Sequence, residues 1–409
     1  MQRQKHIFLV ITIVFLIILT LSQCINRKDQ AANSDPRGEE YADADKCNNC
    51  HKDIYNSYLH TAHHNSSSPA TKETVKGNFE PKANEYFYRP DVKIVMEQRN
   101  DGLYQVAYKD NVEKQANRFD VAIGSGRKAQ TYLYWVEDNA YQLPISYFVP
   151  AKSWVNSPGY PPHQVRFDRN IPIGCFECHS TCIKVTSNAV VGENIIDNFD
   201  KNSIQYGIDC QRCHGPAARH VSFHEEHPEE KAPKFITRYS SLSRQQQVSM
   251  CAVCHSGIQQ TLMSTFQFKP GDTLTNKFFA PAAPVNNIND LDVHGNQTQL
   301  LRASACYLKS KTLTCSSCHN THLTEREDIA LFSQRCINCH NNTSHNLGPM
   351  ESKLGSSIIK NCIDCHMPAK PSKVITLLSN AQASATPDLI RTHLIKIYPE
   401  ESERFLKRK

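Results

Sequence analysis

Hydrophobic and polar positions divide the chain into three parts with different patterns. An apolar run from Ile7 to Leu21 follows the basic residues Arg3 and Lys5, which is the layout of a secretory signal peptide. Apolar and polar residues alternate between residues 85 and 150, as they do in half-buried strands. After residue 166 the signals are helical and short. The pattern predicts a mostly α fold with extensive loops and a small antiparallel β subdomain near residues 85–150.

Two hairpins are predicted inside the β subdomain. Residues 93–98 and 103–108 flank an Asn-Asp-Gly sequence, and Asp-Gly between alternating segments is a strong hairpin signal. Residues 131–136 and 141–148 form a second pair of strand-like segments around Glu137-Asp138-Asn139-Ala140. The subdomain is therefore expected to be an antiparallel sheet built from neighbouring strands.

The sequence Cys-x-x-Cys-His occurs seven times and accounts for fourteen of the seventeen cysteines. Chance would supply on the order of a few hundredths of one match. Two thiols at this spacing can each add to one vinyl group of a haem, and the adjacent histidine then binds the iron. Seven covalently attached haem c groups are therefore predicted. Numbered one to seven in chain order, the motifs are Cys47, Cys50 and His51; Cys175, Cys178 and His179; Cys210, Cys213 and His214; Cys251, Cys254 and His255; Cys315, Cys318 and His319; Cys336, Cys339 and His340; and Cys362, Cys365 and His366.

Zinc binding and disulfides are the alternative explanations of the cysteine pairs. Zinc sites need two such pairs to converge, whereas these seven occur singly at irregular separations and each ends in histidine. A disulfide across a two-residue gap is strained. Both alternatives are less consistent with the pattern than haem c.

Motif spacing predicts how the chain packs. Motif one begins 128 residues before motif two, whereas motifs two to seven fit into 192 residues, or 32 residues each. Segments this short cannot build a hydrophobic core unaided, so we expect the haems to supply it. Residues 241–255 are predicted to form a helix that runs into motif four, and residues 324–327 resemble a capping box ahead of the helix of motif six.

Histidines outside the motifs are candidates for the second axial position of each iron. An iron with histidine on both faces is low-spin and transfers electrons, whereas an open face can bind and activate a small molecule. His220 and His322 lie too close to motifs three and five to reach the opposite face of the same haem, so any iron that they bind belongs to a neighbouring motif. The candidates are His60, His63, His64, His163, His220, His224, His227, His294, His322, His345 and His393.

The segment after the apolar run indicates a membrane anchor. Leu21-Ser22-Gln23-Cys24 resembles a bacterial lipobox, in which Cys24 would be lipidated, although Gln23 replaces the usual small residue. Residues 25–44 are polar and are expected to be a flexible tether. With Cys24 modified, Cys182 and Cys306 are left over, and they could form one disulfide or remain thiols. The apolar run of fifteen residues is short for a membrane-spanning helix.

Net charge does not identify a partner. The formal charge is +6, but the signal peptide removes two basic residues and each ferric bis-histidine haem adds about one negative charge through its propionates. No basic run or aromatic stacking pattern indicates nucleic acid.

Several segments together resemble the multihaem cytochromes of the cytochrome c-554 type: KCNNCHKDIYNSYLHTAHH, GCFECHSTC, YGIDCQRCHGPAARH, LTCSSCHNTH and CIDCHMP. The resemblance covers most of residues 41–393 and implies that His63 and His220 are distal ligands. Comparable late positions point to His294, His322, His345 and His393. The chain departs from the best-known member of that family, which has four haems. It also contains no Cys-x-x-Cys-Lys, the attachment variant of nitrite reductases.

The leading hypothesis is an exported, lipid-anchored electron-transfer protein that is periplasmic or on the outer membrane and serves redox partner proteins or quinol-linked donors. The alternative is an oxidoreductase with one open haem, such as that of motif two beside the β-sheet, acting on a small nitrogen or sulfur compound. A haem-based sensor would need an output module that the sequence does not show.

The predicted organisation is a signal peptide (1–23), a tether after lipidated Cys24 (24–44), a first haem segment (45–82), a haem-free β subdomain (83–165), a six-haem region (166–368) and a C-terminal helical segment with a distal histidine (369–409).

Overall fold

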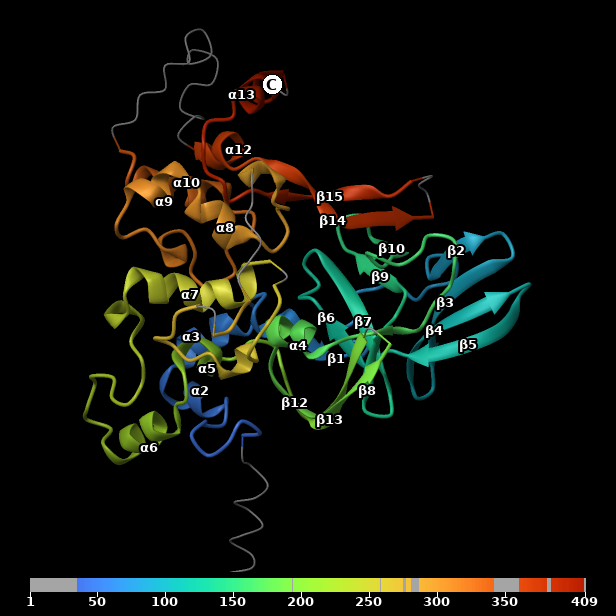
Figure 1. Ribbon diagram of the computed structural model, residues 1–409, viewed down its shortest axis with the longest axis horizontal. Coiled ribbons are helices and arrows are strands. Elements are labelled where there is room, and N and C mark those ends of the chain that lie inside the picture. The colour runs from blue at the N-terminus through green and yellow to red at the C-terminus, as the bar shows by residue number, and fades with distance from the viewer. Residues whose placement is uncertain are drawn as a thin grey trace, which may run out of the picture.

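The computed structural model has a half made of sheets and a half made of short helices and loops (Figure 1). Cys24 and His345, together with the expected signal peptide, lie outside the residues that the structure describes. Those are residues 35–192, 194–257, 259–274, 277–280, 287–341, 360–380 and 384–407.

The sheet half contains two antiparallel sheets. A nine-stranded sheet has the order β1-β6-β7-β9-β10-β14-β15, with β8 paired to β7 and β11 paired to β8. A four-stranded sheet has the order β2-β3-β4-β5. The strands are β1 (Ser67–Pro69), β2 (Glu85–Arg89), β3 (Val92–Arg99), β4 (Gly102–Lys109), β5 (Val112–Arg118), β6 (Val121–Ile123), β7 (Ala129–Val136), β8 (Asn139–Gln142), β9 (Ile145–Phe148), β10 (Ser153–Asn156), β11 (Arg169–Asn170), β14 (Ala369–Ser379) and β15 (Thr386–Arg391).

The predicted hairpins are present. Strands β3 and β4 pair antiparallel in a register that sets Arg99 opposite Gly102, so the first hairpin is confirmed. Strand β7 pairs with β8 as expected, but the second expected strand is divided, because β8 ends at Gln142 and β9 begins at Ile145. Pro144 lies in the gap, and a proline has no N–H to donate to the sheet.

Buried aromatic and aliphatic side chains of residues 75–167 form the largest hydrophobic core. Trp154 packs edge-on against Phe79 and Tyr147, with ring centroids 5.6 and 5.1 Å apart. A Cβ added to Gly77 would lie 2.0 Å from the Trp154 ring, so this close approach requires glycine. The sheet half therefore has a core of its own.

The prediction of a mostly α fold is wrong. The structure is 27% helix and 30% strand. The additional strands lie beyond residue 166, in the hairpin β12 (Ser180–Val191) with β13 (Asn194–Tyr206) and in the hairpin of β14 with β15. Strands β12 and β14 are rich in β-branched residues, which favour extended backbone. The segment 369–409, which we expected to be helical, therefore begins as a hairpin and has its helix only at α13 (Pro399–Lys407).

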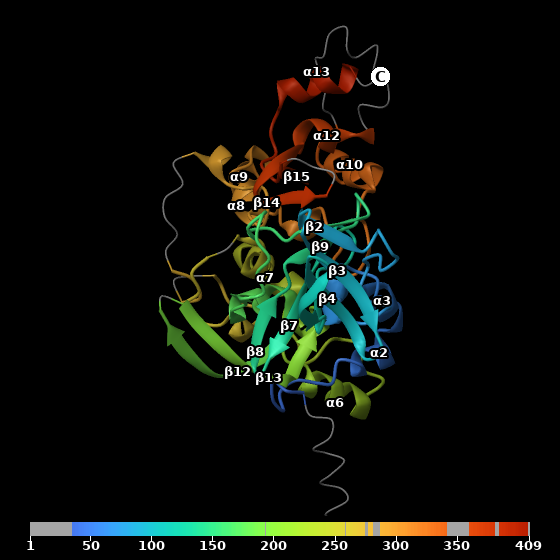
Figure 2. The ribbon, with the colours of Figure 1, turned by 90° about the vertical axis from the view of Figure 1, so that its right-hand side faces the viewer.

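The other half contains the seven Cys-x-x-Cys-His motifs on short helices (Figures 1 and 2). Its α-helices are α2 (Lys46–Cys50), α3 (Lys52–Tyr58), α4 (Ile173–His179), α5 (Cys210–His214), α6 (Ala218–Glu226), α7 (Arg244–His255), α8 (Gln297–Arg302), α9 (Ala305–Lys309), α10 (Ile329–Ile337) and α12 (Cys362–His366). Single 3₁₀ turns are η1 (His64–Ser66), η2 (Tyr239–Ser241), η3 (Thr265–Gln267), η4 (Ile288–Asp290) and η5 (Cys315–Ser317).

Of the two predicted helix starts, that of α7 agrees with the structure and that of α10 does not. Helix α7 runs into motif four as expected, with Ser243 and Gln246 forming a capping box. Helix α10 begins one turn later than expected, because the Asp328 side chain accepts from the Leu331 N–H. Thr324 does not cap it, and its hydroxyl donates to the His60 carbonyl at 2.7 Å instead.

We predict that the two halves respond differently when haem is withheld. The described helical half has a small apolar cluster around Val293, Leu300 and Leu394, so it lacks the burial needed to fold without the porphyrins. Limited proteolysis of chain made without haem attachment should leave a fragment spanning roughly residues 67–170 and digest residues 205–341. Uniform resistance along the chain, read by mass spectrometry, would contradict this division.

Candidate functional site

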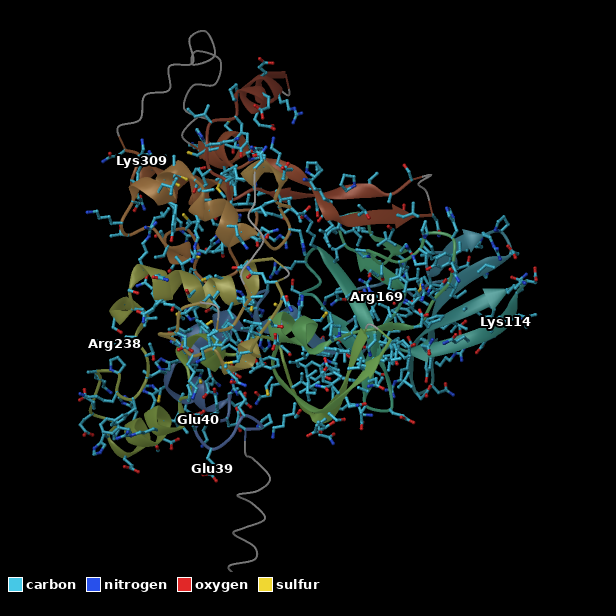
Figure 3. The ribbon with its side chains drawn as sticks, in the orientation of Figure 1. Glu39, Glu40, Lys114, Arg169, Arg238 and Lys309 are labelled. Carbon is cyan, nitrogen blue, oxygen red and sulfur yellow. The ribbon has the colours of Figure 1, made fainter. Side chains whose placement is uncertain are left out.

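One helical turn brings the three reactive side chains of each motif together. The histidine N–H donates to the carbonyl of the first cysteine, at 2.9 Å in motif one, 3.0 Å in motif five and 2.9 Å in motif six. Side chains three and four positions apart lie on one face of a helix, so both thiols and the imidazole point the same way. In Figure 3, Lys309 and Arg238 mark this half, on the opposite side of the molecule from Lys114 at the tip of the sheets. The motifs lie on α2, α4, α5, α7, η5, α10 and α12 or run directly beyond them.

Four motif histidines face a second histidine. The distances between ring centroids are similar, although the angles between the ring planes vary from 11° to 78°. The pairs are His51 with His220 at 6.4 Å, His255 with His63 at 6.3 Å, His214 with His322 at 6.0 Å and His319 with His393 at 6.2 Å.

These distances fit an iron bound between two imidazoles. With a metal–nitrogen bond of roughly 2 Å and a ring centroid roughly 1.1 Å behind the nitrogen, the two centroids would lie roughly 6 Å apart. Rotation of either ring about the nitrogen–iron axis changes the interplanar angle without changing this distance. The side chains of these four pairs therefore fit a six-coordinate haem, and they would hold its iron from both faces.

The facing pairs connect different motifs. His220 lies on α6 after motif three but faces His51 of motif one. His322 follows motif five but faces His214 of motif three. The Nδ1 atom of His220 lies 2.7 Å from the Lys234 carbonyl, and a carbonyl can only accept, so Nδ1 carries the proton. This leaves the lone pair on Nε2, the arrangement that a metal-binding histidine requires.

Burial lowers the pKa of two of the facing histidines, His63 and His393. It lowers the pKa of His63 to about 4, with a further contribution from the nearby His255. It lowers the pKa of His393 to about 4 as well, and His319 adds to the shift. A neutral imidazole is the form that binds a metal, so these side chains can act as ligands at neutral pH.

The other predicted distal ligands stand apart from these four pairs. His294 lies near His179 of motif two, whose pKa is lowered first by burial and then by His294. His345 lies outside the described residues. His366 of motif seven has Nδ1 3.0 Å from the Lys396 carbonyl, which orients its ring in the same manner as that of His220.

The histidines of the last two motifs, His340 and His366, are not among the four facing pairs. In motif six the N–H groups of Cys339 and His340 both donate to the Cys336 carbonyl, at 3.1 and 2.9 Å. The Cys339 side chain is exposed, and that of Cys365 in motif seven is partly buried. Haem attachment at Cys339 and Cys365 and iron ligation by His340 therefore stay predictions from the motif.

Several remaining candidates have other contacts. The ring of His64 packs edge-on against Tyr58 at 5.1 Å. His224 accepts from the Lys234 N–H through Nε2 at 3.4 Å, and His227 lies 3.6 Å from Glu229. These contacts are those of ordinary surface histidines.

Sequence reasoning missed a buried ion cluster that holds motif three. The Arg37 guanidinium lies 2.8 Å from the Asp35 carboxylate and 2.6 Å from that of Asp209, and all three side chains are buried. Asp209 also caps α5 through the Arg212 N–H. Burial alone would raise the pKa of Asp35, but its hydrogen bonds and ion pair with Arg37 outweigh it and lower the pKa. A buried arginine between two carboxylates thus fixes the start of motif three.

The variable positions of motif three also have a structural role. The Gln211 side chain donates to the Ala42 carbonyl at 2.7 Å and accepts from the Ala42 N–H at 3.0 Å. Residues 35–44, which we expected to belong to the tether, are therefore docked on the haem-binding half.

Of the three cysteines outside the motifs, the two that the structure describes, Cys182 and Cys306, do not pair with each other. Cys182 is a buried thiol on β12, near Asp35 and Arg37. Cys306 is a free thiol on α9 and lies 3.6 Å from the Ser304 hydroxyl. The structure therefore does not contain the disulfide that their even number suggested.

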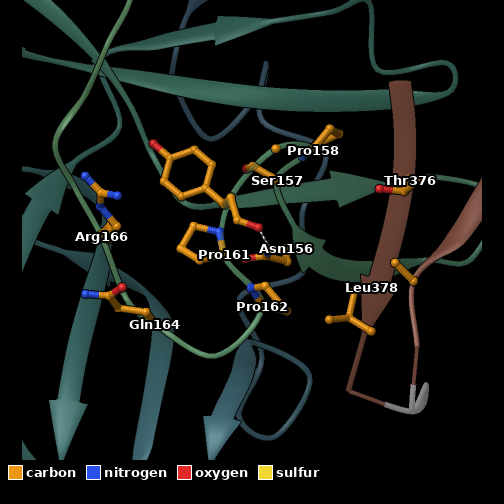
Figure 4. A pocket seen from close by; sticks show the side chains of 12 residues that line it. Asn156, Ser157, Pro158, Pro161, Pro162, Gln164, Arg166, Thr376 and Leu378 are labelled. Atoms are coloured by element: carbon orange, nitrogen blue, oxygen red, sulfur yellow. Dashed lines mark hydrogen bonds between the residues drawn. The ribbon is translucent and has the colours of Figure 1, made fainter. Parts of the chain in front are cut away.

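A cavity of about 450 Å³ lies between β10 and β14 in the sheet half (Figure 4). Pro158, Pro161, Pro162, Thr376 and Leu378 line part of it, and none of its lining residues belongs to a Cys-x-x-Cys-His motif. Within the described part of the chain, no helix is long and apolar enough to cross a membrane.

Comparison with known proteins supports a multihaem c-type cytochrome. No family model matches the chain. The chain is 26% identical over 185 residues to the multihaem cytochrome MtrA of Shewanella baltica (strain OS185), a match that covers 41% of this chain and 51% of that protein. The chain thus spans about half the length of this relative. The crystal structure of outer cell wall cytochrome OcwA is similar to this chain at 17% identity, over 89% of this chain and 81% of that one. The TM-score of 0.48 is too low to establish a shared fold. The resemblance to the cytochrome c-554 type stays a prediction.

Replacement of His63 tests the pairing with motif four. In holoprotein, His63→Ala should convert one haem from low-spin to high-spin or water-ligated, because the other imidazoles that affect His63, those of His319 and His322, belong to other facing pairs. Spin quantitation by low-temperature EPR measures the change. His64→Ala is the matched control, since its ring packs on Tyr58, and it should leave the low-spin signals unchanged. Equal spectra for both variants would contradict the pairing.

Removal of the Arg37 charge should destabilise the protein strongly. Arg37→Met leaves two carboxylates buried without their cation, which costs about 3–5 kcal/mol of unfolding free energy. Arg99→Met is the matched control, because Arg99 also pairs with two carboxylates, those of Glu97 and Glu113, but near the surface of the sheet. Exposed pairs contribute about 1 kcal/mol or less. Denaturant unfolding of both variants compares the two losses, and equal losses would refute the role of burial.

Proposed function

We propose that the chain is an exported heptahaem c-type cytochrome lipoprotein that transfers electrons through closely spaced haems, most of them with histidine on both faces. The observation that carries the proposal is the set of four facing histidine pairs with ring centroids 6.0–6.4 Å apart. A haem held in this way changes oxidation state with little rearrangement of its ligands. That property suits electron transfer better than binding of a substrate at iron.

The haem count follows from the seven motifs, each of which presents two thiols and one imidazole for covalent attachment and axial ligation. His63, His220, His322 and His393 would be distal ligands to motifs four, one, three and five. His294 is proposed for motif two, because it is the histidine outside the motifs that affects His179. His345 remains a candidate for one of the last two motifs.

Membrane attachment is proposed through lipidation of Cys24 after removal of residues 1–23. Such a chain would lie in the periplasm or at the outer-membrane surface and exchange electrons with redox partner proteins or quinol-linked donors. Haem c is attached outside the cytoplasm, where an exported lipoprotein would also be located. The match to a multihaem cytochrome supports partner proteins of this redox type.

Low-temperature EPR on fully oxidised holoprotein tests this function. Mass spectrometry should give seven covalent haems, and the spectrum should contain low-spin ferric signals for most or all of them. Fewer haems would refute the count. A high-spin signal that integrates to about one haem and shifts with nitrite or hydroxylamine would replace electron transfer by an oxidoreductase function.

A further inference from the structure

Contacts between motifs carry information about the order of the haems. In haem c each thiol becomes bonded to a vinyl group at the porphyrin edge. Two thiols of different motifs that touch each other therefore place two porphyrin edges side by side. Electron tunnelling falls steeply with the gap between edges, so these contacts identify the neighbours between which electrons move fastest.

Motif four has contacts with two other motifs through its helix. Helix α7 packs against α4 of motif two and against η5 of motif five. The Cys254 thiol contacts the Cys178 thiol and lies 3.8 Å from the Glu177 carbonyl, within motif two. At its other cysteine, the Cys251 thiol contacts the Cys315 thiol of motif five. The two thiols of motif four thus point toward different neighbours.

Motif three also contacts motifs two and four, through Arg212 and Cys213. Arg212, between the two cysteines of motif three, donates to the Glu177 carbonyl at 2.9 Å and to the Thr265 carbonyl at 2.8 Å. Its guanidinium also lies close to the Cys254 thiol, and Cys213 is a near neighbour of that thiol. Motifs two, three and four therefore converge around one partly buried positive charge, that of Arg212.

The other motifs extend from this point in two directions. Motif one joins motif three, because the Cys47 and Cys210 thiols touch and the Ile208 N–H donates to the His63 carbonyl at 2.9 Å. Motif five joins motif six through Arg335, which donates to the Cys318 carbonyl at 2.6 Å.

Motif six joins motif seven at the far end. Helices α10 and α12 pack together. The Cys336 and Cys362 thiols touch, and the Cys362 N–H donates to the Ser333 hydroxyl at 3.0 Å. These contacts therefore order the neighbouring motifs as one, three, four, five, six and seven. Motif two lies beside this run, joined to motif four by the contact between the Cys178 and Cys254 thiols and to motif three by the Arg212 side chain.

We propose that the haem path is branched: the haem of motif four is a three-way junction, and the haem of motif two is a side branch from an otherwise linear run of six. This inference rests on the proposed seven-haem electron-transfer function. It gives the protein three ends at which electrons can enter or leave. Motif one directly follows the N-terminal segment 35–44 in the chain, and motif seven packs against the C-terminal helix α13 through α12. Motif two lies at the start of the hairpin β12–β13, which begins at Ser180 directly after His179.

Diffraction at the iron absorption edge from crystals of holoprotein tests the order directly. The porphyrin of motif two should have its closest edge contact with that of motif four and no comparable second contact. The porphyrin of motif four should have three such contacts, with motifs two, three and five. A motif-two porphyrin whose closest neighbour is any other haem, or that lies between two neighbours in an unbranched run, would overturn the branch. Seven low-spin haems in a different order would refute the branched path but leave the proposed electron-transfer function in place. Failure of the branch is therefore distinguishable from failure of the function.

Arg212 offers a second test in solution. A positive charge near an iron stabilises the ferrous form and raises its reduction potential. Arg212→Gln should therefore shift the potentials of the haems of motifs two, three and four downward in a spectroelectrochemical titration, while the other four stay in place. Arg212→Lys, which keeps the charge, should leave the three reduction potentials close to those of the unaltered protein. Arg166→Gln is the matched control, because Arg166 pairs with Asp168 on the surface of the sheet half. A shift confined to one haem, or an equal effect of both Gln variants, would contradict convergence at Arg212.

Discussion

Haem binding in this protein depends on the geometry of a single helical turn, repeated seven times. A backbone hydrogen bond from histidine to the cysteine four residues earlier sets the three side chains of a motif on one face. No longer helix is needed to do this, which is why most motifs lie on helices of only one or two turns. Because such helices cannot bury a core, their relative positions must be fixed by something that they share. On the proposed function, four pairs do so, each made of a motif histidine and a histidine from outside the motifs, at a spacing that would accommodate one iron.

Two kinds of core thus coexist in one chain. The sheet half is held by buried aromatic side chains around Trp154, as in an ordinary soluble domain. The helical half has polar anchors at its motif ends, such as the cluster of Asp35, Arg37 and Asp209. Ion pairs give precise positions but little net stability once their desolvation is included. The arrangement is consistent with a half whose stability comes from cofactors and whose side chains mainly define where the cofactors lie.

The sequence predicted what is local and missed what is long-range. Both hairpins of the sheet and the helix of motif four follow from turn residues, alternation and a capping box within a few positions. The facing of His220 with His51 joins positions 169 residues apart and has no local signal beyond the presence of histidine. The hairpin β12–β13 was missed because the motifs around it favoured helix, although its β-branched residues indicated a strand. Arg37 was missed because it lies in a segment whose polar composition is typical of a tether.

The docking of residues 35–44 sets how far the protein can work from a membrane. On the proposal that Cys24 is lipidated, eleven peptide units separate the lipid from Asp35, the first residue of the docked segment. Fully extended, eleven residues span at most about 40 Å. The folded part of the protein would therefore stay within this distance of the bilayer and could not move across the space between two membranes. Electrons would have to cross the space between the membranes through the haems of this protein or through a redox partner protein that binds to it.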